Sequence, residues 1–583
     1  MTENPRQLTT PAPRDLPTYS IKVGSAALAK TYQVLSVRVQ KEVNRIPTAH
    51  LLIKDGDAAA GDFLVSNQEL FVPGKALEIW AGYQGIEKII FKGLVVKHGI
   101  EALSSGSTRL KVVCKDALVK TTLTARQRYF TNKKDSEAAE EIGQSYADLA
   151  IEAEATAFAH PELIQYDTTD WDYVVMRAEA NGQLCFVDDG KLTIAKPNFD
   201  QKPVLGLQFG ATMLAFEAEM DARDQVLDLK TVAWNPADLA TVETEATEPN
   251  WAEQGNLSAK TVAEALSASL LLQHAGQLPP EELQTWADAA LLKRRLAKIR
   301  GRVQCYGNGD LKPGDLIELS GVGERFNGQV LVTGVSHRLE NGQWLTDTQF
   351  GLNPRWFVNE FTVSSPAASG LRPMVSGLQI GVVTGLAGDP SGEERMLVRL
   401  PAISSSDEGT YARVVSLDAG NERGFFFRPE IGDEVVVGFV NNDPSNPIVL
   451  GALHSSKHPA PIKADEANPL KGYVSRSKMK LTFDDEKKTM TLETPAGNLL
   501  KLDEDEKSLT IQDQNGNKII LNDQGITIDS SKDLILKAAN DVTVDGLNIS
   551  QTASAQFKAS GSAGLEVSSS AVATVKGSLV QIN

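Results

Sequence analysis

The C-terminal region, from Ser477 to Asn583, consists of short alternating segments with a repeat of eight residues. Ile526, Leu534 and Val542 are spaced by this repeat, and another aliphatic residue follows each of them two positions later. Two apolar residues with one position between them point to the same side of a strand, so each repeat offers a small apolar wedge and then turns. A repeat this short cannot bury its apolar side alone. The pattern predicts a β-solenoid or an intertwined β-helix, a rigid rod rather than a catalytic pocket.

Large aliphatic residues become rarer beyond Gly546, where Ala, Ser, Gly and Thr take over. Small side chains allow backbones to approach an axis closely, so we expect the rod to narrow there. A flexible low-complexity tail is the alternative interpretation of such a composition. The return of the repeat at Leu565-Glu566-Val567 and Ala573-Thr574-Val575 favours the rod.

Composition limits the remaining possibilities. A chain of 583 residues is expected to hold about three or four domains. The net charge of -17 argues against broad attraction to nucleic acid or anionic lipid. Cys114, Cys185 and Cys305 lie in mostly apolar surroundings, as expected for buried strand thiols in a reducing compartment. Met1–Pro17 is polar and proline-rich and lacks the apolar core of a signal peptide, so we expect synthesis in the cytoplasm and export by another route than general secretion.

Two β-rich blocks with helices between them are predicted ahead of a linker at Ser364–Gly370. The first block runs from Tyr19 to about Asp116, and strands return between Gly301 and Leu352. The helices are predicted at residues 136–149, 170–180, 261–274 and 281–300.

Local signals fix some of these elements closely. Asp170 is a natural N-cap for the helix at 170–180, and Asn181-Gly182 supplies its stop. A hairpin is predicted next, because two alternating runs flank an Asp-Asp-Gly turn at residues 188–190. A capping box that begins at Thr261 opens the third helix.

A compact all-β unit is predicted from Arg372 to about Leu453, with short strands whose spacing and length suit a five-stranded OB-type barrel. Pro429 restricts its own φ, and Gly432 allows a tight reversal before Asp433, so we expect these three residues to shape a structural turn. The strands are predicted at residues 379–386, 396–400, 411–417, 424–428, 434–440 and 448–453.

Three segments point to one family. The barrel carries RPEIGDEVVVGF at Arg428–Phe439 and DPSNPIVLG at Asp443–Gly451. Upstream lies Asp170-Trp171-Asp172-Tyr173 with the Asn-Gly stop and the hairpin, and downstream lie the eight-residue repeats. In this order they resemble the barrel, the hub and the trimeric needle of VgrG spike proteins of type VI secretion, and the related hubs of phage tails and extracellular contractile injection particles. The resemblance covers nearly the whole chain.

This resemblance implies a mainly β, multidomain fold with β-barrel hub domains and inserted helices, an OB-fold barrel and a C-terminal triple-stranded β-helix. The domains implied are a flexible N-terminal arm at 1–17, a baseplate-hub-like domain at 18–365, the OB-fold barrel at 372–453, a linker at 454–472 and the needle at 473–583.

The resemblance also implies a function. The protein would be a homotrimeric central spike that caps an inner tube, punctures a target envelope when a sheath contracts, and carries a tip protein or cargo. Its partners would be a PAAR-like tip protein, an Hcp-like tube protein, baseplate components and effector cargo, without nucleic acid or any cofactor. It would be assembled in the bacterial cytoplasm and delivered outside the cell or into the target. The residues leave open whether the machine is type VI secretion, an extracellular particle or a phage, and which cell and cargo are involved.

We expect the end of the needle to dock the tip protein. Three copies that stop at a strand would leave a blunt face with unpaired backbone groups and apolar side chains. No histidine follows His458 that could hold an apical metal. The expected docking residues are Leu579, Val580, Gln581, Ile582 and Asn583.

Signs of catalysis are weak. The sequence has no Walker-type phosphate loop, no G-x-S-x-G elbow and no paired-cysteine zinc spacing. His454 and His458 are four positions apart. This spacing brings two metal ligands together only on a helix, whereas these residues lie in a proline-rich linker. The acidic groups at 484–486 and 503–506 are typical of solvated corners rather than of glycosidase carboxylates. We therefore expect neither an enzyme nor a metal site.

Two alternatives belong to other classes of protein. A phage tail hub with cell-wall hydrolase activity would need a folded insert between barrel and needle, and about twenty residues are too few for one. A trimeric fibre or adhesin is disfavoured by the lack of a secretion signal and by the OB-type neck.

Overall fold

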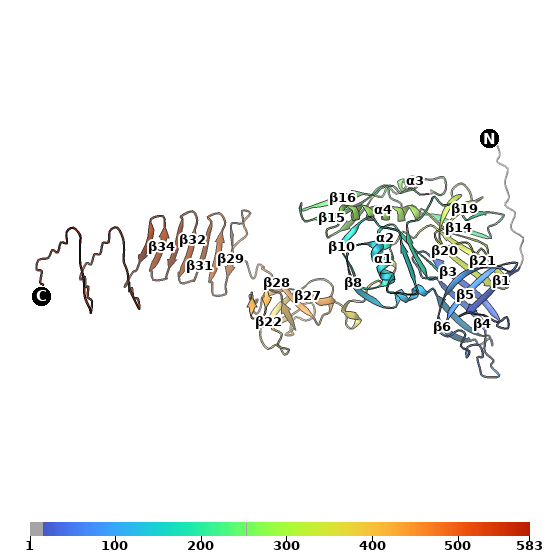
Figure 1. The fold of residues 1–583 in the computed structure, drawn as a ribbon, viewed down its shortest axis with the longest axis horizontal. Helices are drawn as coiled ribbons and strands as arrows, with labels where there is room; N and C mark the ends of the chain where they lie inside the picture. The colour runs from blue at the N-terminus through green and yellow to red at the C-terminus, as the bar shows by residue number, and fades with distance from the viewer. Residues whose placement is uncertain (1–15, 252, 583) are drawn as a thin grey trace. The chain divides into compact units, whose positions relative to one another are not determined.

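The computed structural model describes residues 16–251 and 253–582. Most of the expected arm at residues 1–17, and Asn583, lie outside the described residues. The chain divides into two compact units: a hub that ends at Gly377 and includes residues 439–446, and a second unit that holds the barrel and the needle (Figure 1). Strands far outnumber helices in both units, which confirms the predicted mainly β class.

A 13-stranded sheet forms the main layer of the hub, in the order β14-β18-β21-β20-β3-β4-β7-β6-β5-β1-β2, with β19 paired to β20 and β13 to β19. The two β-rich blocks join where β20 pairs antiparallel with β3. The bounds are β1 Pro17–Val23, β2 Ala26–Ala27, β3 Val34–Glu42, β4 Thr48–Lys54, β5 Ala76–Tyr83, β6 Ile86–Ala102, β7 Thr108–Lys115, β13 Leu205–Gln208, β14 Ala215–Met220, β18 Ile299–Tyr306, β19 Leu316–Ser320, β20 Gly328–Glu340 and β21 Gln343–Phe350.

Alternation along these strands sets the hub core. In β4, Ala49, Leu51 and Ile53 are buried while their neighbours face outward, which is the period of two that a strand with one covered face requires. Leu339 and Trp344, from the second block, pack into the same cluster as the first block. The two blocks therefore share one core.

Helices and small sheets complete the hub. Helix α2 spans Asp170–Ala180 as predicted, although its N-cap is Thr169, whose Oγ1 accepts a hydrogen bond from the Asp172 amide at 3.1 Å. The predicted hairpin is confirmed as β11 and β12. The remaining bounds are η1 Ala117–Thr122, β8 Ala125–Lys134, α1 Asp135–Gly143, β9 Ala150–Ala153, β10 Ala159–Thr169, β11 Leu184–Asp188, β12 Lys191–Ala195, β15 Leu229–Asn235, β16 Ala240–Glu245, α3 Ala259–Glu264, β17 Leu270–His274, α4 Pro280–Leu296, α5 Phe357–Glu360 and η2 Ala367–Gly370.

The helix predicted at 261–274 is wrong in its second half. Helix α3 ends at Glu264, and Ser267 has a positive φ of 48°, which breaks the helical path. The run Leu270–His274 is strand β17, which pairs in parallel with β15. Partners distant in sequence decided the conformation of this apolar run.

The second unit begins with a closed barrel in the order β22-β23-β24-β28-β27, which confirms the five-stranded OB prediction. Its inward side chains, such as Val383, Val398, Val435 and Val449, are almost completely buried. The barrel strands and the 3-10 turn between the last two are β22 Gln379–Gly385, β23 Met396–Arg399, β24 Thr410–Val414, β27 Glu434–Phe439, η3 Val440–Asn442 and β28 Pro447–Ala452.

The strand predicted at 424–428 is not part of the barrel. Two short strands, β25 at Ala419–Gly420 and β26 at Arg423–Gly424, form a small hairpin instead. Phe425–Arg428 then runs without a strand partner toward Pro429. Five strands already close the barrel, so this segment is left on the surface.

The needle begins as a seven-stranded antiparallel sheet in which each strand pairs with the next along the chain (Figure 1). Beyond Asp529 the described residues form no regular strands, so the repeats at Leu534 and Val542 lie outside any sheet of the single chain. One chain alone therefore makes an open meander rather than a closed solenoid. The strands are β29 Leu470–Val474, β30 Lys480–Asp484, β31 Thr489–Glu493, β32 Leu499–Asp503, β33 Ser508–Gln512, β34 Lys518–Asn522 and β35 Gly525–Asp529.

Candidate assembly face

One face of the needle sheet is apolar along its length. Each strand from β30 to β35 places two apolar residues on this face, which we call the apolar face, and the register sets them directly opposite one another. Directly opposite residues of an antiparallel pair share a face and touch across the strands. The apolar face consists of Leu481, Phe483, Met490, Leu492, Leu500, Leu502, Leu509, Ile511, Ile519, Leu521, Ile526 and Ile528.

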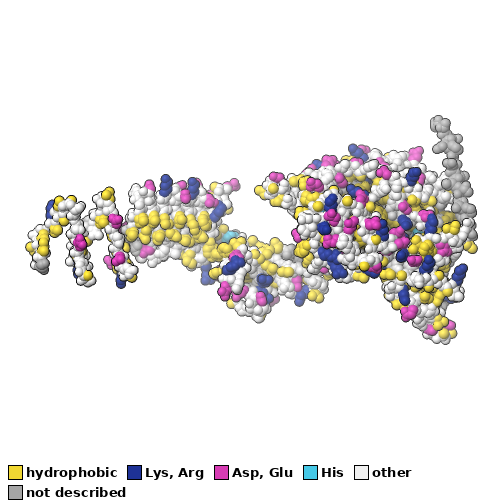
Figure 2. Space-filling model, in the orientation of Figure 1, with side chains coloured by type: hydrophobic (Ala, Val, Ile, Leu, Met, Phe, Trp, Pro, Cys, Tyr) yellow, Lys and Arg dark blue, Asp and Glu magenta, His cyan; other side chains and the backbone are white. Residues whose placement is uncertain are grey.

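This face is uncovered in the single chain, where Figure 2 shows it as a continuous yellow band over the sheet. Leu502 and Ile511 at its centre are each 46% exposed, although residues of this type are normally buried. A soluble monomer rarely exposes a contiguous apolar patch larger than a few hundred Å². The apolar face is therefore of the kind that is normally buried against another apolar surface.

The opposite face of the sheet is mostly polar. Thr482, Thr491, Lys501 and Thr510 stand in register across β30 to β33, with Ile520 as the exception on β34. Threonine pairs across strands suit a pleated surface that faces water. The two faces together define which side of the sheet is available for burial.

Hydrogen bonds at the corners hold the register of the needle strands. Asp513 accepts hydrogen bonds from the side chains and backbone amides of Asn515 and Asn517, which hold its pKa at about 2. Asn517 Oδ1 in turn accepts from Ser530 Oγ at 3.0 Å and from the Ser531 amide at 2.9 Å. The corners therefore fix the strands without help from the apolar face.

The residues predicted to dock a tip protein lie in an extended segment without strand partners among the described residues. Leu579 is 81% exposed, Val580 47% and Ile582 90%, and Gln581 is also exposed. Asn583 lies outside the described part of the chain. The docking role of this segment stays a prediction.

The predicted turn at Pro429, Gly432 and Asp433 is a tight reversal. The Asp433 amide donates to the Glu430 carbonyl at 3.0 Å, and Asp433 Oδ2 accepts from the Glu430 amide at 2.8 Å. Gly432, between them, has φ of +93°, a region that residues with a Cβ rarely adopt. Its amide donates to Val383 in β22, which ties the turn to the barrel wall. Pro429, half-buried, precedes the turn.

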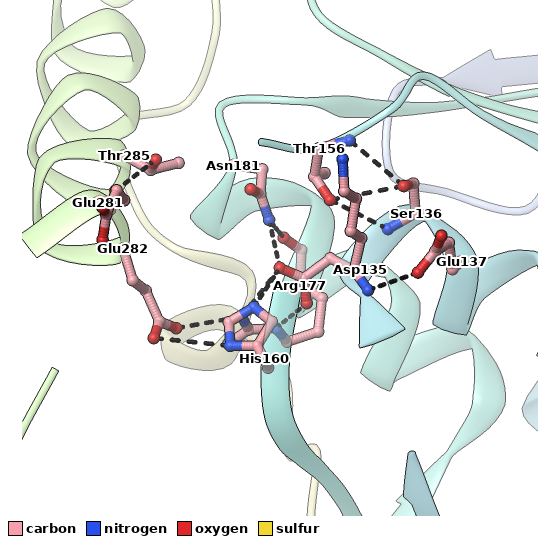
Figure 3. Close-up of polar contacts among 11 residues, drawn as sticks. Asp135, Ser136, Glu137, Thr156, His160, Arg177, Asn181, Glu281, Glu282 and Thr285 are labelled. Atoms are coloured by element: carbon pink, nitrogen blue, oxygen red, sulfur yellow. Dashed lines mark hydrogen bonds and ion pairs between the residues drawn. The ribbon is translucent and has the colours of Figure 1, made fainter. Parts of the chain in front are cut away.

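The hub contains a partly buried cluster of charged groups that the sequence did not reveal (Figure 3). The carboxylate of Asp135, the first residue of α1, accepts hydrogen bonds from Arg177 Nε of α2 at 2.5 Å and from Asn181 Nδ2 at 2.9 Å. His160 Nε2, from β10, lies 3.0 Å from the same carboxylate. Glu282, in the first turn of α4, is 3.2 Å from Arg177 Nη2 and 3.6 Å from His160 Nδ1.

These contacts leave the cluster little chemistry to perform. Burial alone raises the pKa of Asp135, but hydrogen bonds from His160 and Arg177 outweigh this effect and hold its pKa well below the usual range. The same carboxylate raises the pKa of Arg177 above its ordinary value, against the effect of burial. Each group is occupied by another member, so the cluster joins three helices to β10. Its members lie far apart in sequence, so no sequence motif predicted the cluster.

Metal candidates are also weak in the structure. Among the described residues, no group of three or more His, Cys, Asp or Glu side chains could hold a metal ion. His454 and His458 are both exposed, and His458 Nδ1 lies 3.8 Å from Asp433. Cys114, Cys185 and Cys305 are buried free thiols, as predicted, and burial raises the pKa of Cys114 and Cys305 to about 12. None of the described helices has the length and apolar character of a transmembrane span.

Known families match both units. The family described as the Alg8 N-terminal domain matches residues 13–341, more than half of the chain, and the type VI secretion system/phage-baseplate injector OB domain matches residues 379–454. The chain belongs to the Alg8 N-terminal domain family and is similar to VgrG spike proteins of type VI secretion. The OB match covers the five strands that close the barrel of this VgrG-like chain.

The curated relatives are longer than the segments they share with this VgrG-like chain. The spike protein VgrG1b of Pseudomonas aeruginosa is 27% identical over 212 residues, which cover 33% of this chain and 27% of the relative. VgrG5 of the same organism is 36% identical over 99 residues, or 16% of this chain and 12% of the relative. The chain therefore spans about a quarter or less of the length of these two relatives.

A solved E. coli structure, described as a type VI secretion component similar to the T4 bacteriophage tail proteins gp27 and gp5, covers 74% of this chain and 99% of its own. Its identity is 14% and its TM-score is 0.38. The fold of the VgrG-like chain rests instead on its own strands and on the OB-domain match.

Proposed function

We propose that this VgrG-like chain is the central spike of a contractile injection system and works as a homotrimer assembled through its needle. Three copies bring their apolar faces together around one axis, and the polar faces of the three sheets stay in water. The segment beyond Asp529, which has no strand partners within one chain, pairs with the same segment of the other copies. The result is the predicted triple-stranded β-helix.

The uncovered apolar face carries this proposal. From β30 to β35 the strands of the sheet are paired and its corners are hydrogen-bonded, but the apolar side chains of one face have nothing packed against them. Burial of apolar surface is the dominant favourable term in protein association. The names of VgrG1b and VgrG5, both spike proteins of type VI secretion, support the same role for this chain.

Light scattering on the full-length chain tests the proposal. The expected mass is that of a trimer of 62.9 kDa chains, and deletion of Ser477–Asn583 should weaken or abolish the trimer. The truncated protein should keep the circular dichroism of a folded hub. A stable monomer for the full-length chain would contradict the proposal.

The hub takes the tube-capping role in this proposal. Two β-rich blocks in each of three copies present six similar surfaces, which suits a sixfold tube of Hcp-like protein and the baseplate around it. Sheath contraction then drives the tube and its spike through the target envelope. Co-purification of the hub alone with a tube protein is the expected result, and tube binding that requires only the needle would contradict it.

The distal needle takes the tip-binding role, and a PAAR-like protein is the proposed partner, with effector cargo attached to it. Leu579, Val580 and Ile582 supply exposed apolar side chains for this contact. Removal of Leu579–Asn583 should abolish tip binding in a pull-down while light scattering still reports a trimer. Full retention of the tip protein by the truncated spike would exclude this docking site.

We further propose that the spike works mechanically, without catalysis or a cofactor. It is assembled in the bacterial cytoplasm and leaves the cell with the particle. A peptidoglycan-hydrolysis assay on the purified trimer tests the first point, since release of muropeptides would favour a hydrolase-bearing hub.

A further inference from the structure

Three consecutive phenylalanines lie on the surface of the barrel. Phe425 is 53% exposed, Phe426 87% and Phe427 61%, and we call these residues the phenylalanine segment. Phenylalanine rings carry large apolar areas, so the segment exposes far more apolar surface than an isolated surface residue does. It lies outside the five barrel strands and contributes little to the barrel core.

The segment is held in place by its own backbone. The Phe425 amide donates to the Asp418 carbonyl at 3.0 Å, and Ser416 Oγ donates to the Phe425 carbonyl at 2.6 Å. The rings of Phe425 and Phe427 stack with their centroids 6.1 Å apart, and Phe426 between them in sequence is the most exposed of the three. A segment fixed in this way loses little conformational entropy when a partner covers it.

The segment continues the apolar face of the needle. The ring of Phe427 meets the ring of Tyr473 edge-on, with centroids 4.8 Å apart. Tyr473 stands directly opposite Leu481 in the pairing of β29 with β30, so it lies on the same side of the sheet as the apolar face and adjoins it, as does Lys471 opposite Phe483. A copy of the chain that covers the apolar face is therefore brought up to the phenylalanine segment as well.

A receiving surface exists on the outer wall of the same barrel. Leu378, Ile380 and Leu450 are 64%, 46% and 48% exposed, and we call them the leucine wall. Gly438 leaves space between two of them, because a Cβ there would lie 3.4 Å from Leu450 and 3.6 Å from Leu378. The wall thus combines exposed apolar side chains with a position where a side chain is missing.

We infer that the phenylalanine segment of one copy docks on the leucine wall of the next copy, so that three barrels close into a ring. A contact between two unlike surfaces forms a closed ring when its rotation returns to the first copy. The inference rests on the proposed trimer and gives it a second contact, in the barrel, separate from the needle. The partner is a further copy of this chain because the apolar face it continues is the proposed trimer contact.

Cysteine pairs test the contact in the full-length protein. Phe426→Cys combined with Leu450→Cys should give covalent dimers and trimers on a denaturing gel after mild oxidation with diamide. The native cysteines do not interfere, because all three are buried. The matched control combines Phe426→Cys with Ile403→Cys, which is also highly exposed at 72% but lies outside both surfaces, and should cross-link at least tenfold less.

A second variant reports on the strength of the contact. Phe426→Ser should leave a trimer, because the needle remains, but should lower the urea concentration at which the trimer dissociates. Ile403→Ser should leave this midpoint unchanged. If the wild type is a trimer but the Phe426→Cys/Leu450→Cys variant forms no cross-links between copies, or cross-links only within one chain, the barrel contact is overturned while the proposed trimer stands. A wild-type monomer would overturn the proposed function itself.

Discussion

The hub and the needle are built from the same kind of alternating strand, but they complete their cores differently. In the hub, Val39, Ile53 and Phe91 are fully buried by other elements of the same chain. In the needle, Ile511 and Ile528 occupy equivalent inward positions and stay about half exposed. The difference lies in what faces the strands: in the hub it is mainly other strands of the same sheet, and in the needle it is solvent. The hub therefore completes its core within one chain, whereas the core of the needle is completed only in the assembly that we propose.

The largest effect is expected from a charge on the apolar face, which should disrupt the needle assembly and spare the hub. Leu502→Glu would place three carboxylates near the trimer axis, where an uncompensated charge costs several kcal/mol. We expect loss of the trimer in light scattering, with the hub melting transition unchanged. Thr510→Glu, on the polar face of the neighbouring strand, is the matched control and should remain trimeric. A trimeric Leu502→Glu variant would show that the apolar face is not the contact.

A change in the charged cluster should destabilise the hub and leave the trimer intact. Asp135→Asn removes the carboxylate from Arg177 and leaves the cation with Glu282 as its main partner. Loss of one partner of a buried pair costs about 3 kcal/mol or more, so the hub melting temperature should fall while the trimer persists. Lys88→Ala, in the exposed pair with Asp310, is the control and should melt like the wild type.

The turn at Gly432 extends the comparison of hub and needle to the barrel, where a single backbone conformation is expected to affect stability. Gly432→Val forces a side chain into a positive φ, which should destabilise the barrel by on the order of 1–3 kcal/mol. Gly451→Val is a matched control, because that exposed glycine also has open space around it but no positive φ. Equal denaturant midpoints for the two variants would show that the turn does not require glycine.

The smallest expected effect is a pH dependence confined to the hub. Burial lowers the pKa of His337 to about 3, and Lys41 adds to the effect. The unfolded chain therefore binds a proton that the folded hub does not, and stability is lost as the pH falls below 6.5. Between pH 6.5 and 5.5 the loss should be about 1 kcal/mol. His337→Gln should flatten this part of the stability curve, and an unchanged slope would contradict the assignment.

Local signals in the sequence predicted the elements whose determinants are close together. The helix at Asp170–Ala180 and the hairpin after it were predicted nearly to the residue, because a cap, a stop and a turn lie within a few residues of each strand or helix. Barrel closure was also predictable from strand spacing. The run Leu270–His274 was not, since its conformation depends on β15, about forty residues away.

The candidate surfaces were predictable only in part. The eight-residue phase indicated the apolar face around Ile526, but the paired rows on β30 to β34 emerge only once the register is known. The exposure of Phe425–Phe427 could not be predicted, because an alternating run next to a barrel looks the same whether or not the barrel has already closed. The charged cluster joins groups up to 147 positions apart, from Asp135 to Glu282, and sequence alone carries no sign of it.

Because of its strand register, the needle sheet can change in length only by whole hairpins. Neighbouring strands lie about 4.8 Å apart, so one added hairpin lengthens the sheet by about 10 Å. A single residue inserted within a strand would instead turn the following side chains to the other face. Such a rod can be lengthened or shortened during evolution by whole hairpins, each bringing its own corner and its own share of the apolar face, and the reach of the spike would change in the same increments.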